Sequence, residues 1–294
     1  MTAPDVELTR HDVDATLPAS TTPPPSGAVC EAGRQGRPGP MLNPRRWFLR
    51  FGTVVAAALL MILTVDAQRG RFRFAAPPPG ASVPYDGRFT MVRLWYPDYP
   101  GWSFDYPDME RNITLILNDL TVVRTRTDGS NILRMDDPEL MKYPIAYLSE
   151  PGYWYPTDSE AEGLRTYLAK GGFLIVDDFH FENEWRVFEA AMRKVLPDAR
   201  IERLTAAHPI FNAFFSIESL DVPYPGRLGE RGLTGEFYGI YENNDASKRL
   251  AVVVNYNMDI GDYMEHSARG FYAVDPTNEA FKFGVNYVIY GLTH

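Results

Sequence analysis

Two adjacent carboxylates stand at the end of a strongly apolar stretch of the chain. Asp177 and Asp178 follow the apolar run 173–176, and His180 comes two residues later. Adjacent strand residues point to opposite faces, so only one of the two aspartates is expected to face a given crevice. A carboxylate there can act as a general base or bind a metal ion, with His180 and Glu150 assisting it. The alternative is structural: one aspartate caps the next helix and the other is solvated.

A second group of polar side chains lies near the C-terminus. Four oxygen-bearing side chains fall within nine residues and a histidine follows them: Asn257, Asp259, Asp262, Glu265 and His266. Calcium and magnesium prefer oxygen ligands, so Asp259, Asp262, Glu265 and His266 are candidate metal ligands. The spacing matches no calcium-binding loop, and an ordinary acidic surface loop is the alternative.

The histidines give little independent support for a zinc site. A site built from His180, His208 or His266 with a carboxylate lacks the usual ligand spacing. His208 precedes Pro209 among apolar residues, which favours a hydrogen-bonded structural histidine.

Aromatic side chains are concentrated in two loops expected beside these carboxylates. The candidates for ligand binding are Tyr99, Trp102, Tyr106, Tyr153, Trp154 and Tyr155. Flat rings with a polar edge suit the face of a sugar, a peptide or a partner protein. Alternatively, the rings cover the end of the sheet as a minor core.

The segments that must position these residues alternate between strands and helices. Strands are expected at 89–95, 121–127, 144–148, 173–176, 200–204, 236–241 and 250–256. Helices are expected at 109–120, 158–170, 184–196 and 278–290. Thr157 and Glu160 form a capping-box pair at the start of the second helix. This alternation predicts one α/β domain with a doubly wound, mainly parallel sheet and helices on both faces.

Three segments together resemble a bacterial family called domain of unknown function 4159. They are Tyr143-Pro144-Ile145-Ala146-Tyr147-Leu148, the run from Leu164 through Gly171-Gly172 to Asp177-Asp178, and His208-Pro209-Ile210-Phe211. The resemblance covers nearly all of 89–294. It implies a flavodoxin-like fold similar to that of class I glutamine amidotransferases, and it implies no particular reaction.

The chain departs from true amidotransferases at the position of their nucleophile. Those enzymes need a cysteine on a sharp strand-to-helix elbow, with a histidine base nearby. The corresponding strand end here is 177–180, and Cys30 is the only cysteine of the sequence. Thiolate chemistry is therefore excluded for the domain. A Gly-x-Ser-x-Gly elbow, a Gly-x-Gly-x-x-Gly motif and a phosphate loop are also absent, so serine hydrolysis is weakly supported and nucleotide binding is not expected.

The first 88 residues are expected to precede the folded domain. Residues 1–40 have the composition of a disordered leader or of a mis-assigned start before Met41, and 68–88 form a Pro-rich linker. Between them, 41–67 has a basic head, an apolar run and a small-x-Ala end. The head Arg45-Arg46-Trp47-Phe48-Leu49-Arg50 resembles a twin-arginine export signal. The alternative is an uncleaved membrane anchor over 47–65.

The composition of the chain excludes some classes of binding partner. The 294 residues are 45% hydrophobic and 23% charged, which is typical of a globular protein, and their net charge is −9. An acidic chain lacks the basic surface that nucleic-acid binding requires. The 15-residue apolar run is short for a stable membrane span. No organic cofactor is predicted, and a divalent metal is left open.

Two functions from different classes fit these features. The first is a non-catalytic module of the cell envelope that binds a glycan, a peptide or a protein. The second is a hydrolase of an envelope glycan or peptide, metal-assisted or dependent on carboxylates, in which Asp178 or Asp177 acts with Glu150 and a histidine. Both place the protein in the periplasm or outside the cell.

We expect the exported chain to begin at Gln68, after cleavage behind Ala67. Amino-terminal sequencing of the protein recovered outside the cytosol tests this. Exported protein that begins at residue 1, or a complete absence of the protein from that fraction, would contradict the export prediction.

Overall fold

The structure is a computed structural model that describes residues 78–80 and 82–294, all within one compact unit, Ile62–His294. The predictions for the leader at 1–40, for the signal at 41–67 and for most of the linker lie outside these residues.

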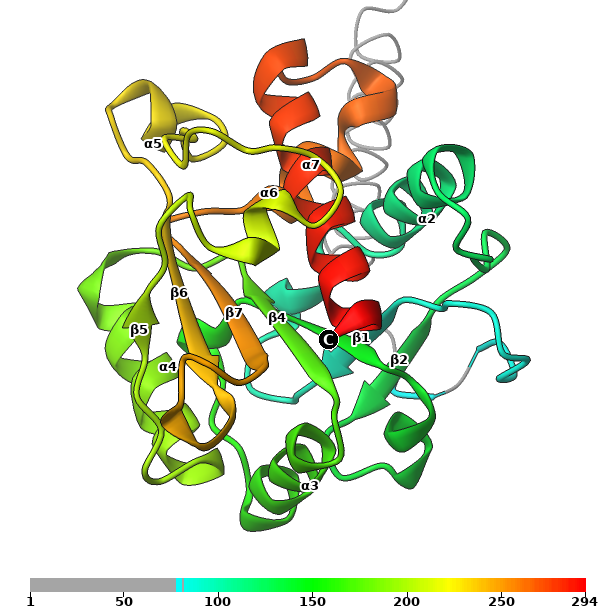
Figure 1. Cartoon of the computed structure of the whole chain (residues 1–294), viewed down its shortest axis with the longest axis vertical. Helices are drawn as coiled ribbons and strands as arrows, with labels where there is room; N and C mark the ends of the chain where they lie inside the picture. The colour runs from blue at the N-terminus through cyan, green and yellow to red at the C-terminus, as the bar shows by residue number, and fades with distance from the viewer. Residues whose placement is uncertain (1–77, 81) are drawn as a thin grey trace, which may run out of the picture. The chain divides into compact units, whose positions relative to one another are not determined.

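A seven-stranded sheet forms the centre of the molecule (Figure 1). Its strands, in spatial order, are β2 (Asn131–Arg134), β1 (Val92–Trp95), β3 (Ile145–Ser149), β4 (Phe173–Asp177), β7 (Leu250–Tyr256), β6 (Glu236–Tyr241) and β5 (Glu202–Arg203). The first five are mutually parallel, whereas β6 runs antiparallel to both of its neighbours. The chain goes from β1 to β2 on one side and then returns to β3 on the other, so the winding direction reverses between β1 and β3.

Helices cover both faces of the sheet. The α-helices are α2 (Asp108–Leu120), α3 (Asp158–Ala169), α4 (Phe181–Val195), α5 (Arg227–Glu230), α6 (Ile260–Glu265) and α7 (Val274–Thr293). Short 3-10 turns are η1 (Pro100–Ser103), η2 (Pro138–Lys142), η3 (Pro151–Tyr153), η4 (Pro209–Asn212), η5 (Glu242–Asn244) and η6 (Ser267–Arg269). Among the described residues, no helix combines the length and the apolar character needed to cross a membrane.

Alternation along β4 divides the core into two layers. Phe173 and Ile175 join the cluster beneath α2, α6 and α7. Leu174 and Val176 join the cluster beneath α3 and α4 on the opposite face. Every residue of β4 is buried, and the strand is apolar from Phe173 to Val176, as expected for a parallel strand covered on both faces. The doubly wound α/β fold predicted from the sequence is confirmed.

Most expected elements form, but one strand was placed wrongly. β6 and β7 have the predicted bounds. The predicted strand at 121–127 is instead irregular, and only an isolated bridge joins Thr125 to Phe89. Val122 is fully exposed, whereas Val123 packs against the core and Thr125 is buried, so the segment is partly covered but pairs with β1 through no regular ladder. On this side β1 pairs with β2, which begins only at Asn131.

Helix α3 begins with the capping box expected from the sequence. The Glu160 amide donates to Thr157 Oγ1 at 3.2 Å, and the Thr157 amide donates to Glu160 Oε2 at 2.9 Å. The two bonds satisfy amide groups that have no partner within the helix.

We expect Thr157→Ala to lower the free energy of unfolding by about 1 kcal/mol, since the hydroxyl acceptor at the helix start is lost. Urea unfolding of the wild-type protein and the variant measures this loss. Thr157→Ser keeps the hydroxyl and is the matched control, so an equal loss in both variants would show that the capping bond is not the cause.

Candidate functional site

The candidate site lies where four neighbouring strands of the sheet end. β1, β3, β4 and β7 are adjacent and parallel, so the loops that follow them meet at one edge. The reversal in winding between β1 and β3 is the position at which open α/β sheets bind ligands. We call this region the carboxyl-edge site. It consists of Tyr99, Asp105, Glu150, Tyr153, Asp177, Asp178, Tyr224 and Asp259.

The backbone of this site is held in unfavourable conformations. Glu150, Asp178, Phe181 and Asn257 have φ between 51° and 62°, and they make up four of the six non-glycine residues with positive φ in the described part of the chain. Each such residue costs about 1–2 kcal/mol relative to an ordinary conformation. Backbone bonds between the loops offset this cost: the Asp178 amide donates to the Met258 carbonyl at 3.0 Å. Clustered strain of this kind is typical of functional sites.

The side chain of Asp177 connects the loops of the site through its hydrogen bonds. Its side chain is fully buried and accepts hydrogen bonds from Tyr147 Oη at 2.7 Å, Asn255 Nδ2 at 2.9 Å and the Gly261 amide at 3.0 Å. Burial raises the pKa of Asp177 to about 6, while the bonds from Tyr147 and Asn255 act in the opposite direction. Because these donors occupy both oxygens, Asp177 ties β3, β4, β7 and α6 together.

Asp178, the neighbour of Asp177, faces a different group of acids. Burial, followed by the charges of Asp105 and Asp177, raises its pKa to about 8. Burial raises the pKa of Glu150 to about 10, with Asp178 as the next cause. Burial and the charge of Asp178 likewise hold the pKa of Asp259 well above its usual value. With pKa values of about 8 and about 10, Asp178 and Glu150 are mainly neutral carboxylic acids at neutral pH, which can donate hydrogen bonds as well as accept them.

Asp105 is the acid of this site that carries its own counter-ion. The guanidinium of Arg93, which is fully buried, donates to both of its oxygens, at 2.5 and 3.0 Å, and to Glu110 Oε1 at 2.5 Å. Burial disfavours the charge of Arg93, but Asp105 and Glu110 outweigh this effect and raise the pKa of the guanidinium. A two-pronged pair of this kind fixes orientation as well as charge.

Aromatic rings border the acids at the reversal in winding. Tyr99 follows β1 and Tyr153 follows β3, and their rings are stacked with centroids 4.2 Å apart and planes 27° apart. Burial raises the pKa of Tyr99, and the charges of Glu150 and Asp178 are the next causes, which places this ring beside the acids. Tyr153 is 38% exposed, and its hydroxyl lies 3.4 Å from Glu184 Oε1.

The remaining aromatic candidates occupy different environments. Trp102 and Trp154 are fully buried within the core, so neither presents a surface to a ligand. Tyr155 is exposed, and Tyr106 lies over the guanidinium of Arg93 with its centroid 5.9 Å from Cζ. The alternative of a minor core therefore describes the two tryptophans, and the ligand-binding alternative remains a prediction for the tyrosines.

His180 lies at the rim of the site. Its Nδ1 is 3.6 Å from Glu184 Oε2, and its ring contacts Tyr224 with centroids 5.2 Å apart. The pKa of Tyr224 is raised by burial and then by the charges of Asp178 and Asp259, so this ring lies near the acids. Tyr224, Glu184 and Asp105 were not among the residues predicted from the sequence. Only Asp105 had a usable signal, its position in the loop after the first strand.

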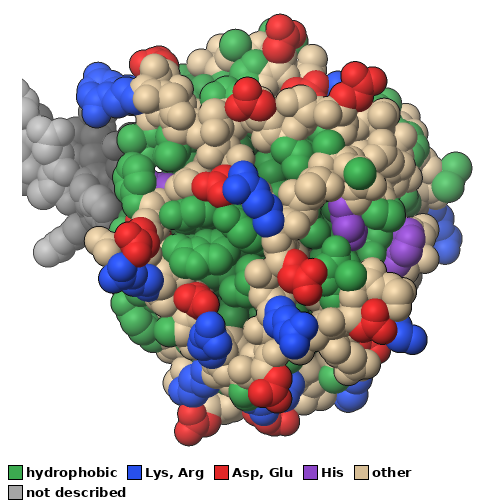
Figure 2. Space-filling model, turned by 60° about the vertical axis from the view of Figure 1, so that its left-hand side comes forward, with side chains coloured by type: hydrophobic (Ala, Val, Ile, Leu, Met, Phe, Trp, Pro, Cys, Tyr) green, Lys and Arg blue, Asp and Glu red, His purple; other side chains and the backbone are tan. Residues whose placement is uncertain are grey.

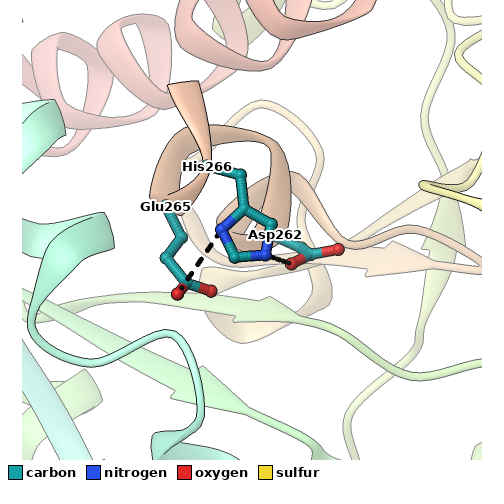
Figure 3. Close-up of side chains that lie close together, drawn as sticks. All are labelled: Asp262, Glu265 and His266. Carbon is teal, nitrogen blue, oxygen red and sulfur yellow. Dashed lines mark ion pairs between the residues drawn. The ribbon is translucent and has the colours of Figure 1, made fainter. Parts of the chain in front are cut away.

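The four candidate metal ligands divide into two environments. Asp262, Glu265 and His266 lie on one turn at α6, and one ligand atom from each falls within 4.8 Å of the others (Figure 3). Asp259 instead caps α6, where its Oδ1 accepts the Asp262 amide at 2.8 Å, and it interacts with Asp178.

Five pockets of the described surface are lined by residues outside the carboxyl-edge site. One of about 490 Å³ is lined by residues of α4 and the loop behind it, including Trp185 and Met192, and holds no cluster of acids. On the face shown in Figure 2, acidic and basic side chains are interspersed with hydrophobic ones. That face offers no broad basic area of the kind nucleic-acid binding uses.

Fold and site together define a doubly wound α/β protein with a strained, acidic carboxyl edge. A family model described as Domain of unknown function (DUF4159) matches residues 89–292, and the chain belongs to that family. The resemblance seen in the sequence is thereby confirmed. A search of curated proteins finds no match.

We expect Glu150→Gln to stabilise the fold above neutral pH. The raised pKa of Glu150 means that its contribution to stability is complete below about pH 4 and decreases as the pH rises toward its folded-state value of about 10. Glutamine resembles the neutral acid at every pH, so the variant gains at least about 1 kcal/mol over the wild type at pH 8 and nothing near pH 4. Urea unfolding across this pH range measures the difference.

Glu218→Gln, at an exposed position, is the control and is expected to follow the wild type at both pH values. A Glu150→Gln curve parallel to that of the wild type would show that Glu150 is not neutral in the folded protein.

Proposed function

We propose that this protein is an exported cell-envelope module that binds a carbohydrate ligand at its carboxyl-edge site. One observation carries the proposal: the stacked rings of Tyr99 and Tyr153 stand at the reversal of the winding, near the half-buried acids Glu150 and Asp178. Aromatic faces suit the apolar faces of sugar rings. The carboxyl ends of the strands at the reversal of winding are also where doubly wound sheets bind ligands.

The protonation of the acids favours a neutral, hydroxyl-rich ligand. Glu150 and Asp178, with pKa values raised to about 10 and about 8, are mainly uncharged at neutral pH. A neutral carboxyl group offers one donor and several acceptor positions, which matches the mixed donor and acceptor character of sugar hydroxyls. A carbohydrate can therefore bind without requiring a buried charge to be created.

The same protonation argues against hydrolysis by these acids alone. Glycoside hydrolysis needs one protonated carboxyl and one ionised carboxylate. Glu150 and Asp178 are both mainly protonated at neutral pH. Asp177, which has a lower pKa, is fully buried with both of its oxygens hydrogen-bonded. Binding without turnover is thus the simpler function for this arrangement.

One observation favours a hydrolase as the second candidate. Asp178 has a φ of 62° at the end of β4, a left-handed turn between strand and helix. In the amidotransferase-like fold implied by the sequence resemblance, the nucleophile stands on an elbow of this kind. A cation bound among the acids would lower their pKa values and provide the ionised base that they otherwise lack.

The proposed location rests on the sequence of 41–67. That segment combines the twin-arginine head, the short apolar run and the small-x-Ala end of an export signal. A glycan-binding module is useful where glycans are assembled, which is outside the cytoplasmic membrane.

We expect soluble glycan fragments of peptidoglycan to raise the melting temperature of the protein, because a ligand that binds only the folded state stabilises it. Tyr153→Ala is expected to weaken binding by about fivefold to tenfold, the value of one lost ring contact. Isothermal titration with the same fragments measures the affinity.

Tyr85→Ala removes another exposed tyrosine, one that contacts Tyr143 just before β3 at the opposite edge of the sheet, and serves as the matched control. Absence of any thermal shift, or an equal loss in both variants, would contradict the binding proposal. Fragments shortened by the wild type but left intact by Asp178→Asn would replace it with the hydrolase.

A further inference from the structure

We propose that the segment 222–235, which leads into β6, is a lid that closes over the ligand of the carboxyl-edge site, with Tyr224 as its contact residue. The inference rests on the carbohydrate-binding function proposed above and adds a moving part to that site. The segment is a hairpin, because Pro223 and Thr234 form an antiparallel bridge across it.

The lid leaves the sheet beside the acids. Glu236, the first residue of β6, lies opposite Tyr256, the last residue of β7. Since β7 is one of the four strands whose carboxyl ends form the site, the start of β6 lies at the same edge of the sheet. Figure 1 shows α5, at the tip of the lid, projecting beyond this end of β6 and apart from the helices that cover the sheet.

The base of the lid is fixed to the domain. The Tyr224 amide donates to the Leu233 carbonyl at 2.9 Å, which joins the two sides of the hairpin. The hydroxyl of Tyr263 on α6 donates to the Pro223 carbonyl at 3.1 Å, and the side chain of Val222 is buried in the core. Tyr224 therefore extends from a part of the hairpin whose position is defined by contacts with the rest of the domain.

The side chain of Tyr224 lies near three acids of the site. Its ring contacts that of His180, with centroids 5.2 Å apart and planes 62° apart. Burial, followed by the charges of Asp178, Asp259 and Glu150, raises the pKa of its hydroxyl, so the hydroxyl keeps its proton at neutral pH. This hydroxyl forms no hydrogen bond with another residue in the described part of the chain. It is therefore a donor that a hydroxyl-rich ligand can satisfy.

The acids lie between two groups of aromatic rings. In sheet order, Glu150 follows β3, Asp178 follows β4 and Asp259 follows β7. Tyr99 follows β1 on one side of this series, and Tyr224 precedes β6 on the other. A carbohydrate that extends across the acids from the Tyr99 side therefore approaches the lid, where a second aromatic ring suits the face of a sugar.

The tip of the lid makes few contacts with the domain. Helix α5 buries none of its residues, and Arg227 and Arg231 are exposed to solvent. Gly226 and Gly232 flank the helix with φ of 66° and 92°, and a Cβ added to either would meet no atom within 4 Å. Glycine at such positions lets the backbone change its torsion angles at little cost. A fixed base with a sparsely packed tip is typical of binding-site lids.

Hydrogen–deuterium exchange of the full chain, with and without soluble glycan fragments of peptidoglycan, tests the lid. The amides of 226–232 should exchange rapidly in the free protein, and a saturating concentration of fragments should slow their exchange by about tenfold or more. The mostly exposed segment 243–248, which joins β6 to β7 at the opposite end of the same strands, is the internal control. Its exchange should not change.

Tyr224→Phe keeps the ring and loses the hydroxyl. It should weaken binding of the fragments by about fivefold in isothermal titration, because one hydrogen bond to the ligand is lost. Tyr85→Phe removes the hydroxyl of an exposed tyrosine far from the site, beside Tyr143, and is the matched control that should bind as the wild type does.

The outcomes separate the lid from the binding function. Fragments that bind the wild type without slowing exchange at 226–232, or that bind Tyr224→Phe as tightly as the wild type, overturn the lid in favour of a rigid hairpin in which Tyr224 only covers His180. Fragments that do not bind the wild type at all overturn the proposed function, and the lid with it. The exchange measurement needs no variant, so it decides the question even if Tyr224→Phe fails to fold.

Discussion

The hydrogen bonds of the buried Asp177 are the constraint on which the carboxyl edge depends. A carboxyl group without water must find its partners within the protein, because an unpaired buried polar group is costly. Its three donors come from β3, β7 and the start of α6, so one side chain at the end of β4 fixes four elements at once. Gly261 has to be a glycine for this reason, since a Cβ there would lie 2.7 Å from the hydroxyl of Tyr147. The position of α6, and with it the turn of Asp262 and His266, follows from this contact.

Arg93 balances the charge of the acids on the other side of the site. It occupies the centre of β1 with no exposed surface, and its guanidinium holds Asp105 and Glu110. Asp105 is one of the charges that raise the pKa of Asp178. The buried arginine thus holds Asp105 in place beside Asp178, whose pKa it helps to raise. Burial and charge pairing together produce the hydrogen-bonding surface on which the proposed carbohydrate site depends.

Much of the fold followed from local pattern, and the failures have clear causes. The strands β6 and β7 and the capping box of α3 were predicted because apolar alternation and helix-capping chemistry are encoded by adjacent residues. The strand placed at 121–127 was wrong because only Thr125 there forms a bridge, to Phe89, and β1 pairs along its length with Asn131–Arg134 instead. Helix α6 was missed because six residues are too few to show a helical period.

The sequence by itself determined the class of fold, the absence of a cysteine nucleophile from the domain, and the four loops in which acids and rings gather. Only the tertiary structure decided the environment of each side chain. It buried Asp177 and left Asp178 in a left-handed turn, enclosed Trp102 and Trp154, and brought Tyr224 to the acids from a loop with no motif. Burial, hydrogen-bond partners and pKa depend on contacts between residues far apart in the chain, and local sequence patterns do not encode such contacts.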